Sequence, residues 1–220
     1  MSDYPIVLTS LDDCHCIVVG GGPVAARKVR ALVEAGVRPV VISPELCSEL
    51  ERVVASGEAR VIRRPYRQDD LEGAGLVIAA TDARTVNEEI ANECRRRKVL
   101  INVVDCPDLC TFTAPSTIRR GDLLVTISTG GHSPAFSRFM REILEPILSE
   151  TYGDMLAILS ELRPRIRRRV DRSKQRALWD RLLDGKVMDR LRTQGMVAAR
   201  ALADRIVEDY CTPTERQVAG

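Results

Sequence analysis

The feature that most constrains the fold of this chain is a glycine turn near the N-terminus, at residues 20–22. An apolar, β-branched run precedes the turn at residues 17–19, and a stretch of helical composition follows it at residues 23–35. Strand, glycine turn and helix in this order have the G-x-G-x-x-A spacing of a dinucleotide-binding site. The helix N-terminus would offer free N–H groups to phosphates. A plain turn between a strand and a helix is the alternative.

Each small residue of this motif has a role in the dinucleotide interpretation. Gly20 allows the tight turn, Gly22 lets the backbone approach a pyrophosphate, and Ala25 allows the helix to pack closely on the strand. The motif therefore predicts the following cofactor-binding residues: Gly20, Gly21, Gly22, Pro23, Val24 and Ala25.

Short apolar runs alternate with helical segments over the first hundred residues. Strands are predicted at 17–19, 37–42, 59–63, 76–80 and 100–104, and helices at 23–35, 45–56 and 84–97. This alternation predicts an α/β fold with a Rossmann-type parallel sheet covered by helices on both faces. Ligands of such sheets bind beyond the carboxyl ends of the strands. Gly20, Ser43, Thr81 and Asp105 follow four strands and are expected to meet at one crevice, with Asp82 and Val104 beside them.

The residue after the second strand bears on the choice of dinucleotide. An acidic residue there usually binds the ribose 2′-hydroxyl, and this position falls near Ser43. Ser43 can still hydrogen-bond to a ribose hydroxyl, and no arginine stands immediately beside it to bind a 2′-phosphate. The sequence therefore favours NAD over NADP.

The pattern changes after residue 105. Strands at 112–119 and 123–129, joined by residues 120–122, predict a hairpin. Ser133 is expected to cap a helix that has Pro134 in its first turn and is kinked or ended by Pro146. Residues 154–210 are expected to be helical, with breaks near Pro164 and Gly185, and the last ten residues to be a frayed tail.

Three regions follow from this pattern: an NAD-binding domain at 1–112, a small α+β dimerisation region at 113–150 and a basic helical domain at 151–220. A hairpin and one helix cannot readily bury their own apolar faces. A homodimer through residues 113–150 is therefore predicted.

Charge and composition limit the classes of partner. The net charge is +2, and the positive excess is densest at residues 163–169. Such a block is typical of an anionic partner, either nucleic acid or a polycarboxylate, or is simply a solvated helix face. Only 4% of the residues are aromatic, which leaves little for base stacking. No apolar run approaches the roughly 18 residues of a membrane span.

Cysteine usage and the N-terminus predict a cytoplasmic protein. Seven cysteines at irregular spacing do not suggest a disulfide framework, and the polar N-terminus does not resemble a signal peptide. Cys14-His15-Cys16 lacks a second ligand pair with zinc-type spacing, so no metal site is predicted.

Two residues are candidates for catalysis. Asp105, at a strand end, could accept a proton as hydride leaves a substrate, although it could equally close an Asx-turn. His132 lies in a glycine loop at a helix start, where it could bind substrate or metal, shuttle protons, or be an exposed loop residue.

Taken together, the motifs resemble those of the precorrin-2 dehydrogenase and sirohydrochlorin ferrochelatase family, the dehydrogenase–chelatase part of siroheme synthase. They occur in the family's order and spacing over roughly residues 5–150. The matching segments are 20–28, 79–82 with Val86-Asn87, 102–105, Pro115-Ser116, 120–123, and 127–134 with Arg138 and Arg141-Glu142. The helical remainder resembles the family in length and basic character only.

The resemblance implies NAD-dependent oxidation of precorrin-2 to sirohydrochlorin by a homodimer and, in bifunctional members, insertion of Fe²⁺ to give siroheme. It carries the family's essential aspartate onto Asp105. Because ferrochelation also needs a base, Asp105 could serve both steps, with His132 as a helper. Because precorrin-2 bears eight carboxylates, arginines and loop N–H groups are expected to bind it. The substrate-binding candidates are Ser116, Arg119, Arg120, Thr129, Gly130, Arg138 and Arg167.

Other interpretations stay open at this point. Thr129 stands where the family often has serine, and the sequence ends before any methyltransferase domain, so a trifunctional siroheme synthase is not expected. A chelatase with a vestigial dinucleotide site would share these motifs. A non-catalytic NAD-sensing regulatory module with a basic DNA-binding tail would share the glycine turn and the arginine block.

Overall fold

The computed structural model describes residues 4–211 of the chain. It divides into two compact units, residues 1–114 and residues 115–220. The predicted tail lies outside the described residues except for Cys211. Among residues 4–211, no helix combines the length and the apolar character that crossing a bilayer requires.

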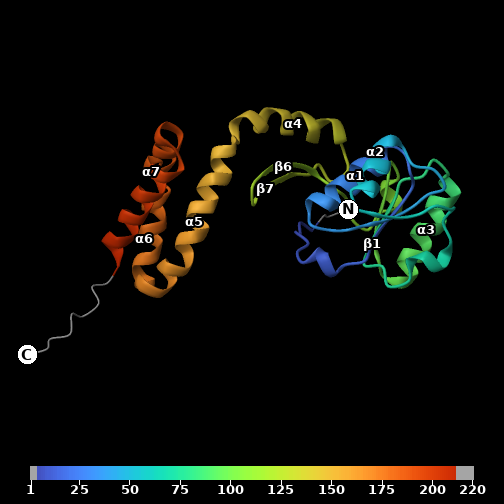
Figure 1. The fold of residues 1–220 in the computed structure, drawn as a ribbon, viewed down its shortest axis with the longest axis horizontal. Coiled ribbons are helices and arrows are strands. Elements are labelled where there is room, and N and C mark those ends of the chain that lie inside the picture. The colour runs from blue at the N-terminus through green and yellow to red at the C-terminus, as the bar shows by residue number, and fades with distance from the viewer. Residues whose placement is uncertain (1–3, 212–220) are drawn as a thin grey trace, which may run out of the picture. The chain divides into compact units, whose positions relative to one another are not determined.

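The first unit is a five-stranded parallel sheet in the order β3-β2-β1-β4-β5. Figure 1 labels β1 of this sheet and the helices around it. Its strands are β1 (Cys16–Val19), β2 (Val40–Ile42), β3 (Arg60–Ile62), β4 (Leu76–Ala79) and β5 (Leu100–Val103). Its helices are α1 (Pro23–Glu34), α2 (Ser48–Ala55) and α3 (Arg84–Arg97), with short 3₁₀ turns η1 (Leu11–Asp13), η2 (Gln68–Leu71) and η3 (Pro107–Leu109). This architecture confirms the predicted α/β fold.

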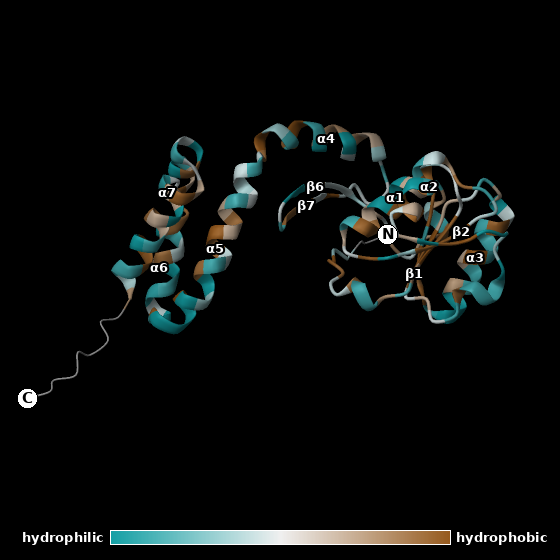
Figure 2. Ribbon diagram, in the orientation of Figure 1, coloured by the Kyte–Doolittle hydropathy of each residue, from teal (hydrophilic) through white to brown (hydrophobic). Residues whose placement is uncertain are grey.

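Strand β1 explains why the strands are apolar throughout rather than alternating. Successive side chains of a strand point to opposite faces. Cys16 and Val18 pack in the core under α1 and α2, whereas Ile17 and Val19 pack in the core under α3. Burial on both faces therefore requires an apolar residue at every position, and Figure 2 shows β1 and β2 as hydrophobic along their length.

The second strand begins later than predicted, at Val40 rather than at residue 37. The Val37 N–H donates to the carbonyl oxygen of Leu32 at 3.0 Å and so closes the end of α1. Pro39 has no N–H to donate to a neighbouring strand. Val37 is apolar and buried, but its N–H belongs to the helix end, and the ladder of β2 starts only after Pro39.

The second unit contains the hairpin β6 (Ser116–Arg120) and β7 (Leu123–Ile127), followed by four helices. The helices are α4 (Pro134–Ile147), α5 (Glu150–Arg169), α6 (Arg172–Leu182) and α7 (Lys186–Tyr210). Helices α5, α6 and α7 share one apolar core, which includes Ile158, Leu178 and Ala203. Helix α4 packs against β6 and β7.

The hairpin is shorter than predicted at both ends. Strand β6 starts at Ser116 because the N–H groups of Thr111 and Phe112 donate to the carbonyl of Ile101, which attaches residues 111–112 to β5. Strand β7 ends at Ile127 because Thr129 takes part in the cap of α4.

The break predicted near Pro164 was wrong, whereas the one near Gly185 is confirmed. Pro164 lies on the exposed side of a continuous α5, where water can satisfy the carbonyl that a proline leaves without a donor. The helix ends instead at Val170, and Asp171 caps α6 by accepting a hydrogen bond from the Ser173 N–H at 3.0 Å.

Candidate functional site

The glycine turn is pressed against the loops that follow the two neighbouring strands. Gly20 has a φ of +128°, and a Cβ there would lie 2.3 Å from the carbonyl oxygen of Ala80. A Cβ on Gly21 would lie 1.8 Å from the carbonyl oxygen of Glu45. A Cβ on Gly22, by contrast, would meet no atom within 4 Å. The turn is thus closed toward the protein and open on the side of Gly22, where a pyrophosphate could approach the backbone.

The N-terminus of α1 has no side chain to cap it. Gly22 is the N-cap, Pro23 occupies the first helical position, and the first N–H bonded to this turn is that of Ala26, which donates to Gly22 at 3.0 Å. The N–H groups of Val24 and Ala25 have no protein acceptor within residues 4–211. Unpaired N–H groups at a helix start form an anion-binding site.

A cavity of about 600 Å³ opens beside this helix start. Its volume falls in the range typical of small-molecule and cofactor sites. The residues that line it lie at the carboxyl ends of β1 and β2 or follow β1, β2, β3 and β4: Val19, Gly20, Gly21, Gly22, Pro23, Val24, Ile42, Ser43, Pro44, Glu45, Leu46, Cys47, Pro65, Tyr66, Ala80, Thr81, Asp82 and Val86. These residues fit a dinucleotide, because a glycine cradle, free N–H groups and apolar walls meet in one cavity.

Most predicted cofactor residues line this cavity, and two do not. Ala25 is fully buried and packs in the core under α1, which fits its predicted role in packing helix against strand. Val104 is not among the lining residues.

The loop after β4 is held by a residue to which the sequence analysis assigned no role. The Thr81 hydroxyl donates to Asn87 Oδ1 at 2.7 Å, and Asn87 Nδ2 donates back to the Thr81 carbonyl at 2.9 Å. Asn87 is buried on α3. This reciprocal pair orients Thr81 at the edge of the cavity. The motif match included Asn87, but only the contact shows what it does.

Asp105 lies at the same edge of the sheet as the glycine turn, beyond β5, but it is not among the residues that line the cavity. It is exposed and has a φ of +56°, a left-handed conformation uncommon for a residue other than glycine. The Cys106 N–H donates to the Val103 carbonyl at 3.3 Å across this turn. The Asp105 carboxylate itself makes no hydrogen bond within residues 4–211, so the alternative of an Asx-turn is not observed.

A lysine that the sequence analysis left without a role stands near this carboxylate. Lys28 lies half-buried on α1. Its pKa is lowered mainly by burial and then by the Arg27 charge, and the Cys110 and Asp105 charges oppose that shift. The Asp105 charge is the smallest of these influences on the pKa of Lys28.

The remaining predicted residues belong to the second unit, where the loop of residues 128–133 joins β7 to α4. Thr129 Oγ1 accepts hydrogen bonds from the Ser133 N–H and the Ser137 hydroxyl, both at 3.2 Å. The Ser133 hydroxyl caps α4 by accepting from the Phe136 N–H at 3.2 Å, as predicted. His132 is exposed in this loop, its N–H donating to the Thr129 carbonyl at 3.0 Å. Gly130, beside it, is exposed too, whereas Ser116, at the start of β6, is half-buried.

The candidate arginines divide into two groups. Arg119, Arg138 and Arg167 are exposed and make no ion pair within residues 4–211. Arg120 is engaged, because its Nε donates to the Leu148 carbonyl at 2.6 Å and its other two nitrogens donate to the carbonyls of Arg119 and Glu145. Arg120 therefore ties the hairpin to the junction of α4 and α5.

The basic block is partly structural as well. Arg165 donates to Asp204 at 2.6 Å and Arg169 to Glu208 at 3.5 Å, which links α5 to α7. Within residues 4–211, no three His, Cys, Asp or Glu side chains are arranged to hold a metal ion.

Two family models match the chain. One, described as "Putative NAD(P)-binding", covers residues 7–116, and the other, described as the sirohaem synthase dimerisation region, covers residues 151–207. Among solved structures, the one named "SirC, precorrin-2 dehydrogenase" is similar over 94% of this chain and 100% of its own, with a TM-score of 0.75 and 27% identity.

Curated relatives named siroheme synthase are similar over nearly the whole chain. That of Methylobacillus flagellatus is 37% identical over 94% of this chain and 44% of its own length. That of Nitrosospira multiformis is 38% identical over 100% of this chain and 47% of its own length. The chain thus spans about half the length of the curated relatives it matches. It belongs to the family of siroheme synthases and precorrin-2 dehydrogenases, in the part that contains the NAD(P)-binding domain and the dimerisation region.

Proposed function

We propose that this protein oxidises precorrin-2 to sirohydrochlorin with NAD as the hydride acceptor. The observation that carries the proposal is the dinucleotide-type cavity at the glycine turn. The chain that contains this cavity is similar to a protein named precorrin-2 dehydrogenase over the whole length of that protein. The relatives named siroheme synthase, which contain a similar segment, support a role in tetrapyrrole synthesis.

The residues of the cavity would hold the cofactor. The open face of Gly22 and the unpaired N–H groups of Val24 and Ala25 would bind the pyrophosphate, and Thr81 and Asp82 would border the far side. Bound NAD would supply a nicotinamide ring that accepts a hydride from the substrate.

Asp105 is the proposed base. Its carboxylate is exposed, makes no hydrogen bond in the described chain and stands in a strained backbone conformation at the ligand-binding edge of the sheet. Strain of this kind is found at sites where geometry matters for function. Asp105 would take the proton that the substrate loses along with the hydride.

Exposed cations and loop N–H groups of the second unit are proposed to bind the substrate carboxylates. We retain Arg119, Arg138 and Arg167, with Ser116, Thr129 and Gly130, and we keep His132 as a helper in proton transfer. Arg120 is left out, because its guanidinium already donates to three backbone carbonyls.

The proposal also includes that the protein forms a homodimer, is located in the cytoplasm and uses Fe²⁺ as a second substrate. Free thiols at all seven cysteines fit a reducing compartment. The regulatory alternative with a DNA-binding tail has no support, since the similar proteins carry the names of enzymes.

The deciding experiment incubates the purified protein with precorrin-2, with and without NAD, and follows NADH absorbance and the tetrapyrrole spectrum. We expect NADH to form in proportion to sirohydrochlorin. Adding Fe²⁺ afterwards tests ferrochelation by the appearance of the siroheme spectrum. Absence of NADH formation by a folded protein would overturn the dehydrogenase proposal, and metal insertion alone would favour a chelatase.

A further inference from the structure

Strand β5 is the last strand of the first sheet, and side chains rather than another strand close its outer edge. The Val104 N–H donates to the Ala79 carbonyl at 2.9 Å, on the side of β4. Because alternate residues of a strand bond to opposite neighbours, the backbone groups of Ile101 and Val103 face the open side. The edge of a sheet leaves such groups without partners unless another segment supplies them.

The segment after η3 supplies these partners with two neighbouring side chains. Thr111 Oγ1 accepts a hydrogen bond from the Ile101 N–H at 2.9 Å, and Cys110 Sγ accepts one from the Val103 N–H at 3.1 Å. Both side chains thus serve the edge of β5. They differ in place, because Val103 is the last residue of the strand and Ile101 lies two residues before it.

The Cys110 thiol also contacts the turn that carries Asp105. This turn is closed by the hydrogen bond from the Cys106 N–H to the Val103 carbonyl, and Asp105 is its third residue. Cys110 Sγ lies 3.3 Å from the Val103 carbonyl oxygen and 3.4 Å from the Cys106 carbonyl oxygen, so its one hydrogen can be donated to either. One sulfur atom therefore contacts the first and the last residue of the turn.

The position of the Asp105 carboxylate depends on the backbone of this turn, because the carboxylate makes no hydrogen bond within residues 4–211. The φ of +56° at Asp105 is a conformation that the surrounding structure has to hold. Buried Asn102 supports the sulfur from the strand side. Its Nδ2 donates to the Phe112 carbonyl at 3.1 Å and lies 3.6 Å from Cys110 Sγ.

We propose that Cys110 is a positioning residue for the oxidation of precorrin-2. Its thiol holds the turn of residues 103–106, so that the Asp105 carboxylate keeps the orientation in which it accepts the substrate proton. The C–S bond is longer than the C–O bond of serine, which helps one atom to reach both ends of the turn. Cys110 acts through the backbone and takes no proton itself. This inference rests on the role of Asp105 in the proposed function.

Cys110→Ala tests the proposal in the steady-state oxidation of precorrin-2. We expect kcat to fall at least about 10-fold, since a misplacement of about 1 Å can cost roughly 10²-fold in rate. The KM for precorrin-2 and the affinity for NADH should stay near the wild-type values. Cys110→Ser, which keeps a donor and an acceptor, should restore most of kcat. Cys110→Val suits the extended backbone of this residue but supplies neither group, so it should not.

Thr111→Val is the matched control. It removes the other side-chain hydrogen bond at the edge of β5, away from the turn of residues 103–106. This variant should lower the free energy of unfolding and keep the wild-type kcat. Chemical denaturation of every variant allows kcat to be given per folded protein. A merely structural role of Cys110 predicts the same result for Cys110→Ala, namely lower stability with an unchanged kcat, and that result would overturn the proposal.

A double variant shows whether Cys110 acts through Asp105. In the Asp105→Asn protein, Cys110→Ala should leave the residual kcat unchanged, because no base is left to misplace. A further loss as large as that in the wild-type background would overturn the proposal. Should Cys110→Ala not fold, Cys110→Val replaces it in both backgrounds.

The outcomes also separate this inference from the proposed function. A wild-type protein that oxidises precorrin-2 together with a folded Cys110→Ala variant of wild-type kcat would refute the role of Cys110 alone. A folded wild-type protein that forms no NADH with precorrin-2 would refute the proposed function and this inference together.

Discussion

At the scale of single residues, backbone conformation and hydrogen bonding distinguish residues available for chemistry from residues used in the architecture. Asp105 has a positive φ and a carboxylate without a hydrogen bond in the described chain. Arg120 and Thr81 are polar and were predicted as site residues, yet their donors bond to neighbouring protein groups. Polar character alone therefore does not identify a ligand-binding side chain.

Asp105→Asn tests the catalytic assignment with little change in shape. Asparagine tolerates the left-handed conformation, so the free energy of unfolding should change little. Turnover of precorrin-2 should fall at least about 10²-fold, because the amide cannot accept the proton. The measurements are steady-state kinetics, NADH binding and chemical denaturation. Unchanged turnover would rule out Asp105 as the base, and loss of NADH binding would indicate a wider disturbance.

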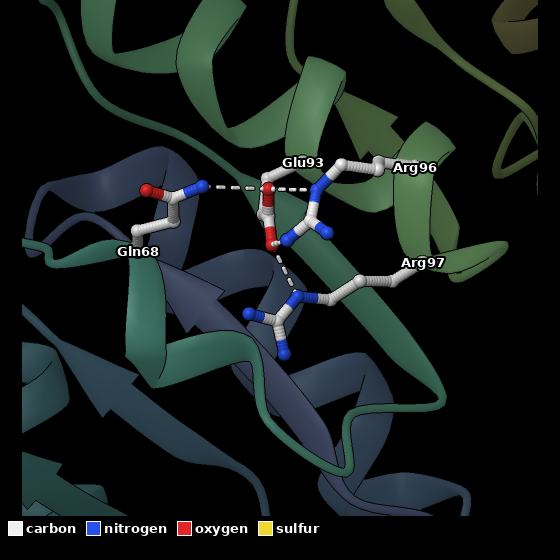
Figure 3. A network of polar contacts seen from close by, with 4 residues as sticks. All are labelled: Gln68, Glu93, Arg96 and Arg97. Carbon is white, nitrogen blue, oxygen red and sulfur yellow. Dashed lines mark hydrogen bonds and ion pairs between the residues drawn. The ribbon is translucent and has the colours of Figure 1, made fainter.

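At the scale of elements, one buried carboxylate joins α3 to η2. Glu93 accepts a hydrogen bond from Gln68 Nε2 at 2.8 Å and from Arg96 Nε at 2.9 Å, and it also pairs with Arg97 (Figure 3). These groups, with Arg96 the largest cause, lower the pKa of Glu93 to about 2. The cluster positions η2, and with it the loop that brings Pro65 and Tyr66 to the cavity.

The sign of the resulting pH dependence follows from that lowered pKa. The folded protein holds Glu93 charged, so its ion pairs contribute stability above pH 4.5, its usual pKa, and this contribution is lost as pH falls toward 2. Glu93→Gln should unfold at lower denaturant concentration at pH 7 and show a weaker loss of stability between pH 4.5 and 2.

The control for this prediction is Glu88→Gln on the same helix. Glu88 pairs with Arg84 at 2.8 Å on the exposed side of α3. Exposed ion pairs one helical turn apart contribute little to stability. The free energy of unfolding of this variant should therefore depend on pH as that of the wild-type protein does. If the free energy of unfolding fell equally steeply between pH 4.5 and 2 in the wild-type protein and in Glu93→Gln, the assignment of the pH dependence to Glu93 would be contradicted.

At the scale of the whole molecule, α4 carries an apolar stripe that the described residues leave uncovered. Phe136, Phe139, Ile143 and Ile147 are between 44% and 59% exposed. Their spacing of three or four residues places them along one side of the helix. Exposed apolar patches of this kind mark association surfaces. The stripe lies within the region predicted to form the homodimer, which stays a prediction.

Phe139→Asp tests that prediction. A charge in the centre of an apolar interface must be desolvated without a partner, so we expect a dimer for the wild-type protein and a monomer for the variant in sedimentation velocity at micromolar concentration. Glu142→Gln, an exposed change on the same helix, should remain dimeric. A monomeric wild-type protein, or a dimeric Phe139→Asp variant, would refute association through α4.

Local chemistry allowed the sequence to determine much of the first unit. The glycine turn and the doubly buried strands of that unit, like the cap at Ser133 in the second unit, depend on backbone conformation and on periodicities of a few residues, which are visible in the chain itself. Where the pattern was misleading, the hydrogen bond from Val37 that closes the end of α1 and the access of water to Pro164 decided the outcome.

The tertiary structure alone decided which polar groups remain free. The Ser43 hydroxyl and the Arg120 guanidinium were both predicted as site groups, and both donate to carbonyl oxygens that the fold brings close to them. A sequence shows which side chains can donate or accept hydrogen bonds. Only the packed chain shows whether those bonds are already made, because that depends on distances between residues far apart in the sequence.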